Sequence, residues 1–404
     1  MSRRVFEILI ILFVVLGAME FLKVYFLPFN QIKYIQLAGI GIVFLIVIIE
    51  YVYNREKRFH PFFGKEIFLI LLSVILSMFT AYSGHGQSFA ITFIAQRFMY
   101  FYIFYFLLHV LRVQPGDVEN FIVIFGIAIS ILYLLQYVIY PRVIFDVRIA
   151  KERGTLRIFL PGVSFVIMNF FIALVKFFKQ YEIKWLGLVF LSLMIIIFLG
   201  TRQIIFSVML ITIIYLLTSK QIKSKILLIP IGFLALIPIF FLFENIINEL
   251  LNLSERQGTG SDEVQRVKTI TFFLTEFYPN KMAYFIGNGV DSQNSDYGVE
   301  IQRLRIDGNY YLSDIGIIGN YIRYGVLFLF SVFSILIKVF KYKLSDNLFY
   351  IKLYFSMIAL LLVTGGDFGD VFSYVPLLML LYLIDVDLYE STANKLNVKT
   401  QDNG

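Results

Sequence analysis

Apolar residues follow one another along this chain in long unbroken stretches, and short polar segments separate them. Stretches such as ILIILFVVLG and FLILLSVILSMF show no alternation of apolar and polar positions, so they predict helices rather than the strands of a membrane barrel. A helix that crosses the hydrocarbon core of a bilayer, about 30 Å thick, needs roughly 20 apolar residues. Twelve spans are predicted, at residues 5–27, 34–53, 67–83, 88–111, 119–140, 158–176, 185–199, 204–218, 226–243, 315–337, 348–364 and 371–388.

This pattern predicts an all-α polytopic membrane protein in which residues 1–404 form a single transmembrane domain. Composition agrees, because 59% of the residues are hydrophobic and 16% are charged, which is more apolar than a water-soluble domain. One connecting segment, residues 244–314, is much longer than the others. We expect it to be a long extracytoplasmic loop inserted between the ninth and tenth helices.

The distribution of charge predicts the orientation of the chain. A formal net charge of +7 would suit a nucleic-acid partner, but the lysines and arginines are concentrated in every second connecting segment, beginning with Arg3 and Arg4. This is the pattern of the positive-inside rule, which predicts that both termini are cytoplasmic and that the partner is the lipid bilayer, not nucleic acid. The first apolar run is expected to be an uncleaved helix, because no small-residue cleavage site follows it.

The residue types present also limit the chemistry. The chain has no cysteine, and its three histidines, His60, His85 and His109, are far apart in the sequence. Disulfides and thiolate metal sites are therefore excluded, and a histidine metal cluster is not expected. No glycine-rich nucleotide loop is found either. We expect no metal and no cofactor, so that any chemistry rests on other charged side chains.

Two outer segments have features that a simple turn does not need. Residues 141–159 hold five basic residues against two acidic ones; this excess suits an anionic ligand, although a short loop held by its flanking helices also tolerates it. In residues 244–314, VQRVKTITFFLTEF predicts a helix that ends before Pro279, and FIGNGVDSQNSDYG predicts a turn. QRLRIDGNYYLSD then leads into the tenth helix, which Asp314 is expected to cap.

Arginines are the strongest candidates for ligand contact. The guanidinium group is always charged, and its planar fork binds two oxygens of a carboxylate or phosphate at once. Two arginines, Arg97 and Arg323, lie inside predicted helices, where a charge costs several kcal/mol unless it faces a partner or a wet cavity. Either they form buried pairs with acids such as Glu20 or Asp367, or they line an outward-opening anion cavity. Arg202, in a tight turn, either extends to the membrane interface or contacts a ligand.

The order of several local motifs resembles the O-antigen ligase and polymerase superfamily. Between residues 198 and 328 the chain has GTRQIIFSVML, an arginine on a helix in DEVQRVKTITFF, the glycine turn FIGNG, and IDGNYYLSDIGIIG before a helix. The resemblance implies the membrane-embedded glycosyltransferase fold of the C type (GT-C). The ligase pattern has a histidine before its asparagine, whereas this chain has Asp307, Gly308 and Asn309, which is more similar to the polymerases of lipid-linked repeat units.

The resemblance implies an O-antigen or capsular polysaccharide polymerase (Wzy-like) at the outer face of the bacterial cytoplasmic membrane. Such an enzyme transfers a growing glycan from undecaprenyl diphosphate to a hydroxyl of the next lipid-linked repeat unit and releases undecaprenyl diphosphate. A chain-length regulator is a candidate partner. A ligase shares most of these motifs and stays an alternative. A lipid-linked glycan transporter is the other alternative, but such proteins often have internal repeats, and none is visible in this sequence.

The site residues that this resemblance implies are mostly arginines. Asp307 stands in the position of the ligase histidine, where it would orient or deprotonate the acceptor hydroxyl; a turn-forming Asp-Gly pair is the alternative. The predicted catalytic residues are Asp307, Arg305 and Arg266. The predicted contacts of the diphosphate or sugar are Arg97, Arg153, Arg157, Arg202, Arg303, Asn309 and Arg323.

Overall fold

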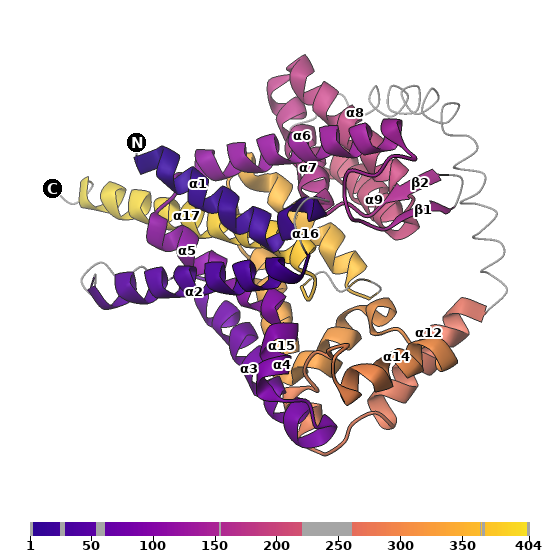
Figure 1. Cartoon of the computed structure of the whole chain (residues 1–404). Helices are drawn as coiled ribbons and strands as arrows, with labels where there is room; N and C mark the ends of the chain where they lie inside the picture. The colour runs from indigo at the N-terminus through magenta and orange to yellow at the C-terminus, as the bar shows by residue number, and fades with distance from the viewer. Residues whose placement is uncertain are drawn as a thin grey trace. The chain divides into compact units, whose positions relative to one another are not determined.

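The computed structural model describes residues 3–24, 29–53, 61–152, 155–219, 261–363, 365 and 368–401. Helices make up most of this part of the chain (Figure 1). Within these ranges six helices are long and apolar enough to cross a membrane, or seven if one bent pair counts as a single span. The predicted all-α membrane protein is therefore confirmed at this level. The twelve spans stay a prediction, and the span at 226–243 lies outside the described residues.

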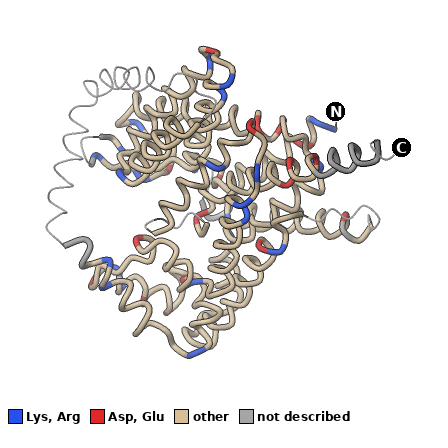
Figure 2. Tube along the Cα trace, turned by 180° about the vertical axis from the view of Figure 1, so that it is seen from behind, with Lys and Arg blue, Asp and Glu red and all other residues tan. Residues whose placement is uncertain are grey.

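The contacts divide the chain into two compact units. The first comprises residues 1–122, 266–348 and 362–404, and the second comprises residues 123–265 and 349–361. Charged residues are sparse along the middles of the long helices and lie mainly near helix ends and in connecting segments (Figure 2). The elements of the first unit are α1 (Arg3–Ala18), η1 (Glu20–Lys23), α2 (Phe29–Tyr53), α3 (Gly64–His85), α4 (Phe89–Ala95), η3 (Arg97–Ile103), α5 (Phe104–Leu111), the start of α6 (Pro115–Ile139), α12 (Ser261–Thr275), α13 (Ala283–Ile286), α14 (Asp296–Gly308), η4 (Leu312–Ile315), α15 (Gly316–Lys341), η5 (Asp346–Leu348) and α17 (Val371–Gln401).

The second unit contains the rest of α6, a short hairpin and further helices. These elements are β1 (Ile149–Glu152), β2 (Thr155–Ile158), α7 (Val163–Gln180), α8 (Ile183–Phe198), α9 (Arg202–Thr218) and α16 (Phe349–Leu361). The two strands pair antiparallel, with Ile149 opposite Ile158. The sequence analysis did not predict this hairpin. The sequence of β2, TLRI, alternates polar and apolar residues as a strand requires, but four residues are too few for that pattern to stand out among helices.

The helix predicted at 88–111 is broken. α4 and the segment that begins at Arg97 meet at an angle of 65°. Polar side chains at the break bond to neighbouring elements: Gln96 Nε2 donates to Ser77 Oγ, and Arg97 Nε donates to Gln36 Oε1, each at 2.9 Å. Polar groups in an apolar region need such partners. The bend therefore occurs where consecutive polar side chains interrupt the apolar run.

α15 is also interrupted, at Gly325. The backbone of Gly325 has φ 76° and ψ −166°, a conformation that glycine adopts more readily than other residues. The carbonyls of Ile322 and Arg323 accept hydrogen bonds from the amides of Asn288 and Gly289, both at 2.8 Å. Buried carbonyls require such partners, and here the backbone of a separate loop provides them beside the break.

We use the name cap for residues 261–315, which contain α12, α13, α14, η4 and the loop 287–295. Its core, with one residue of α15, consists of Phe273, Phe277, Tyr297, Ile301, Leu312, Ile315 and Ile322. Burying a large apolar side chain stabilises the folded state by about 1.5–3 kcal/mol, so this cluster fixes α12 and α14 against the start of α15. The predicted helix before Pro279 and the predicted glycine-rich turn are both confirmed.

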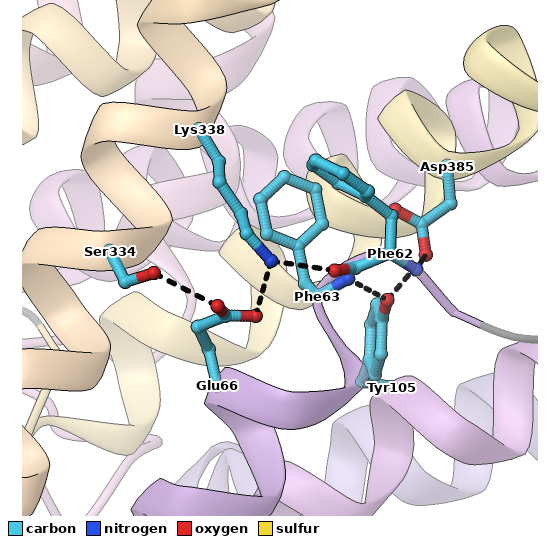
Figure 3. A network of polar contacts seen from close by, with 7 residues as sticks. All are labelled: Phe62, Phe63, Glu66, Tyr105, Ser334, Lys338 and Asp385. Carbon is cyan, nitrogen blue, oxygen red and sulfur yellow. Dashed lines mark hydrogen bonds and ion pairs between the residues drawn. The ribbon is translucent and has the colours of Figure 1, made fainter.

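A polar network joins the other ends of α3 and α15 to α5 and α17 (Figure 3). Lys338 Nζ donates to Glu66 Oε2 at 2.8 Å and to the carbonyl of Phe62 at 2.9 Å. The Phe62 amide donates to Asp385 Oδ2 at 3.1 Å, and Asp385 also accepts from the hydroxyl of Tyr105. The charges of Lys338 and Glu66 compensate each other, so this network braces the helices rather than offering a free charge to a ligand.

Candidate functional site

The loop 287–295 belongs to the first unit and lies beside the break in α15. His85 ends α3, and its Nε2 is 3.1 Å from Asn288 Oδ1, which accepts the hydrogen bond. The side chain of Asn288 in turn donates to the carbonyl of Ile322 at 3.0 Å. The imidazole of His85 stacks on Tyr297, with ring centroids 4.1 Å apart. His85 therefore links α3 to the loop and, through Asn288, to α15.

Gln87 is a second anchor of the loop. Its Oε1 accepts from the Ser292 amide at 3.0 Å and from Ser295 Oγ at 2.6 Å. Its Nε2 donates to the carbonyl of Val290 at 2.9 Å. Because Gln87 is fully buried, water does not compete for these hydrogen bonds. Asp291 lies between the anchored residues, so its backbone is held on both sides.

Arg323, beside the break in α15, carries a charge that no described residue compensates with an ion pair. Its Nε atom is enclosed and has no hydrogen-bond partner, and its guanidinium group forms no ion pair with any residue that the structure describes. It lies roughly 10 Å along the helix from Gly316, at 1.5 Å per residue. A charge at such a depth is costly unless an anion or a wet space meets it. Asp367, one of its predicted partners, lies outside the described residues.

Asp291 and Arg305 form a pair near Arg323. Arg305 Nη2 lies 3.6 Å from Asp291 Oδ2, and the Asp291 side chain is 12% exposed. Both groups act on the hydroxyl of Tyr297: burial raises the pKa of this hydroxyl, Asp291 and Glu300 raise it further, and Arg323 and Arg305 lower it. Charged groups from the loop, α14 and α15 therefore lie around one buried phenol, which stays protonated.

The predicted catalytic residue Asp307 lies on another face of α14 from Arg305. Arg303 Nε is 3.3 Å from Asp307 Oδ2, and these side chains are 81% and 65% exposed, respectively. Residues two positions apart on a helix point in opposite directions, so the Arg303–Asp307 pair faces away from Asp291. Asp307 is in the last turn of α14, and Asn309, in a left-handed conformation, ends the helix.

Arg266 and Asp314 are two other residues of the cap for which the sequence predicted a role. Arg266 is an exposed residue of α12. Asp314 lies in η4, is exposed, and accepts from Ser313 Oγ at 3.0 Å. No side chain caps the start of α15. The expected cap by Asp314 was wrong, because the 3₁₀ turn of η4 separates this aspartate from the first turn of α15.

Arg97 differs from Arg323 because it has partners within the protein. Besides its hydrogen bond to Gln36, its Nη2 lies 3.7 Å from Glu20 Oε1. Glu20 also pairs with Lys23, at 2.9 Å. This geometry corresponds to the buried pair, one of the two interpretations of the sequence. Of the two arginines within membrane helices, Arg97 pairs with an acid, whereas Arg323 forms no ion pair with a described residue.

In the second unit, Arg157 holds the turn between α8 and α9. Its Nε donates to the carbonyl of Leu199 at 2.9 Å, and its Nη2 donates to Thr201 Oγ1 at 3.3 Å. A cation at the C-terminus of a helix also interacts favourably with the helix dipole. Arg202 is the first residue of α9, and Arg153 lies outside the described residues. Arg157 therefore has a structural contact that stabilises this turn.

The sequence analysis did not single out His85 or Asp291. His85 ends a long apolar helix and looked like an isolated histidine, with no pattern around it to indicate a partner. Asp291 was part of a glycine-rich stretch and was interpreted as a turn residue. The sequence feature that could have indicated Asp291 is its position directly after GNGV. Glycines allow the backbone to approach a neighbouring helix closely, and the side chain that follows them is then also close to that helix.

No protein-family model matches the sequence, and a search of the curated proteins finds no match. The described helices define an all-α membrane protein. Within it, the uncompensated Arg323 and the neighbouring Asp291–Arg305 pair are the features from which a function can be inferred.

Proposed function

We propose that the chain is a glycosyltransferase that polymerises an O-antigen or capsular polysaccharide. It joins undecaprenyl-diphosphate-linked oligosaccharide repeat units at the outer face of the bacterial cytoplasmic membrane and releases undecaprenyl diphosphate. The observation that carries this proposal is the uncompensated guanidinium group of Arg323 beside the break in α15. The order of motifs from residue 198 to 328 supports the same class of enzyme.

Arg323 suits a diphosphate group that is attached to a membrane lipid. Such a lipid keeps its tail in the bilayer and its charge near the bilayer surface, and Arg323 belongs to a helix that is long and apolar enough to span a membrane. A fixed cation stabilises the negative charge that develops on a leaving diphosphate. The low dielectric constant of a partly buried position makes that interaction stronger than it would be in water.

The cap offers groups that suit the sugars of the repeat units. Tyr310 stacks on Phe272, with ring centroids 4.8 Å apart, and the neighbouring Tyr311 is exposed. Aromatic rings provide an apolar face and, in tyrosine, a polar edge, which matches the faces and hydroxyls of a sugar ring. The exposed pair of Arg303 and Asp307 adds hydrogen-bonding groups on α14.

Reconstitution tests the proposal. The purified full-length protein, in lipid vesicles, is supplied with undecaprenyl-diphosphate repeat units from its own gene cluster, and the products are separated on a gel. A ladder of product lengths is expected. A single transfer to an added lipid A core acceptor would instead indicate a ligase. Intact lipid-linked substrate recovered on the opposite leaflet, with no transfer, would indicate a transporter.

Two variants test whether Arg323 is required in this assay. Arg323→Ala is expected to produce no ladder, because the leaving diphosphate loses its fixed cation. Lys268→Ala removes an exposed cation from α12 and serves as the matched control, with a ladder like that of the unmodified protein. If Arg323→Ala made the same ladder at the same rate, the proposal would lose the observation on which it rests.

A further inference from the structure

Asp291 lies in the loop whose Gly289 amide bonds to the carbonyl of Arg323, and its carboxylate pairs with Arg305. We propose that Asp291 takes the proton from the acceptor hydroxyl during glycosyl transfer, and that Arg305 holds its carboxylate in position. This inference rests on the proposed function, and it assigns to Asp291 the role that the sequence analysis gave to Asp307.

The geometry of Asp291 meets the requirements for this role. Its side chain is mostly enclosed, at 12% exposure, and Arg305 Nη2 lies 3.6 Å from its Oδ2. Arg305 pairs with Oδ2, and no other described side chain pairs with the carboxylate, so Oδ1 can accept from a ligand hydroxyl. The hydrogen bonds of Gln87 to Ser292 and of Gln87 to Val290 fix the loop on either side of it. A catalytic group needs such support, because small displacements reduce rates strongly.

Asp291 is also near the group that would bind the diphosphate. The charges of Asp291 and Arg323 shift the pKa of the same buried hydroxyl, that of Tyr297, in opposite directions. The loop that carries Asp291 also bonds directly to Arg323, because the amide of Gly289 donates to the carbonyl of Arg323 at 2.8 Å. A direct glycosyl transfer requires a proton acceptor and a cation for the leaving group in the same region of the protein.

Asp307 lacks these features. Its side chain is 65% exposed, and it pairs with Arg303 on the face of α14 that points away from Arg305. Water competes with an acceptor hydroxyl for an exposed carboxylate, whereas a site that excludes water strengthens the hydrogen bond that the reaction needs. Arg303 and Asp307 can contact sugar without taking part in the proton transfer.

The oxygen of the acceptor hydroxyl forms a bond to the anomeric carbon of the donor glycan, and its proton passes to the carboxylate of Asp291. The bond from that carbon to the diphosphate oxygen breaks, and the electron pair leaves with the diphosphate, next to Arg323. Undecaprenyl diphosphate is released, and Asp291 then returns the proton to water through its exposed edge.

Asp291→Asn tests this inference in the reconstituted full-length protein. The transfer rate is expected to fall about 100-fold or more, the range of general base catalysis. Binding of the undecaprenyl-diphosphate donor to the same vesicles is expected to change less than about twofold, because Arg323 is intact. Asp291→Glu keeps a carboxylate and should recover part of the rate. Asp296→Asn, at an exposed position at the start of α14, is the matched control and should keep the full rate.

The dependence of the rate on pH separates a proton acceptor from a structural residue. The pH profile of kcat/KM should differ between the unmodified protein and Asp291→Asn, because only the unmodified protein has a carboxylate at this position. If Asp291→Asn kept more than half of the rate, or lost donor binding as strongly as transfer, or kept the same pH profile, the inference would be wrong while the proposed function would stand. If the unmodified protein made no ladder, both would be overturned.

Discussion

The amide of Gly289 donates a hydrogen bond to the carbonyl of Arg323, at a distance of 2.8 Å. This bond joins a loop of the cap to an interrupted membrane helix, and the neighbouring bond from Asn288 to Ile322 reinforces it. Hydrogen bonds in a region with little water are strong and costly to break. The position of the Arg323 guanidinium group therefore depends on the cap as well as on α15, which makes the loop a sensitive point for mutation.

Gly287→Ala is expected to disrupt this junction. Gly287 has φ 80°, and an added Cβ would overlap the carbonyl of Arg323, so the substitution combines backbone strain with a steric clash. We expect the free energy of unfolding to fall by about 2 kcal/mol or more and the transfer activity to be lost. Thermal unfolding in detergent, together with the gel assay, measures both effects.

The control for that substitution is Gly187→Ala, on α8. An added Cβ at Gly187 meets no atom within 4 Å, and alanine favours a helix over glycine by about 1 kcal/mol. This variant should be as stable as the unmodified protein or slightly more stable. Equal stability of Gly287→Ala and Gly187→Ala would show that the loop and α15 are not tightly joined.

Arg97 and Arg323 should respond differently to the same substitution. Arg97→Ala removes a partner of Glu20, whose side chain is 4% exposed, and a buried carboxylate that loses part of its compensation destabilises the fold, here by about 1–3 kcal/mol. Arg323→Ala removes a charge that has no described partner, so stability should be unchanged or higher while transfer is lost. Thermal unfolding of the two variants side by side checks this contrast; a greater loss of stability in Arg323→Ala than in Arg97→Ala would contradict it.

The helices were predictable from sequence for a physical reason. In a bilayer the backbone must satisfy its own hydrogen bonds, so a long apolar run has few alternatives to a helix. The pattern at 34–53 and 67–83 is followed closely by α2 and α3. The bend at Gln96 was not predictable, because it depends on Ser77 and Gln36, which are distant in the sequence.

The candidate site was predictable only in part. The arginines stood out because a charge in an apolar segment is unusual, and Arg305 and Arg323 do lie in the region of interest. The sequence does not specify which face of α14 meets the loop, so Asp307 and Arg305, two residues apart, were both assigned to the catalytic residues. The roles of His85 and Asp291 arise from contacts between α3 and the loop, and no local pattern encodes such contacts.

His85→Phe is expected to weaken the anchoring of the loop without changing its aromatic packing. A phenyl ring can still stack between Phe277 and Tyr297, but Asn288, which is fully buried, loses the donor to its Oδ1. An unsatisfied buried polar group costs about 1–3 kcal/mol, and transfer should fall as the loop shifts. Tyr82→Phe, at an exposed position on the same helix, is the control for thermal unfolding and transfer. Unchanged stability in His85→Phe would mean that the hydrogen bond between His85 and Asn288 does not help to hold the loop.

The Glu66–Lys338 pair should show strong coupling in a double-mutant cycle. Lys338→Met leaves Glu66, 5% exposed, without its cation, and also removes the donor to the carbonyl of Phe62, so we expect a loss of about 3 kcal/mol in unfolding free energy. Glu66→Gln should cost less, because an amide can still bond to Ser334. Starting from Glu66→Gln, the Lys338→Met change should cost about 1–3 kcal/mol less than it does in the unmodified protein.

The exposed Arg303–Asp307 pair, measured in the same double-mutant cycle, is the control and should couple by less than about 1 kcal/mol. Similar coupling energies for the two pairs would show that burial does not strengthen the Glu66–Lys338 interaction, and that the network does not brace the helices as described.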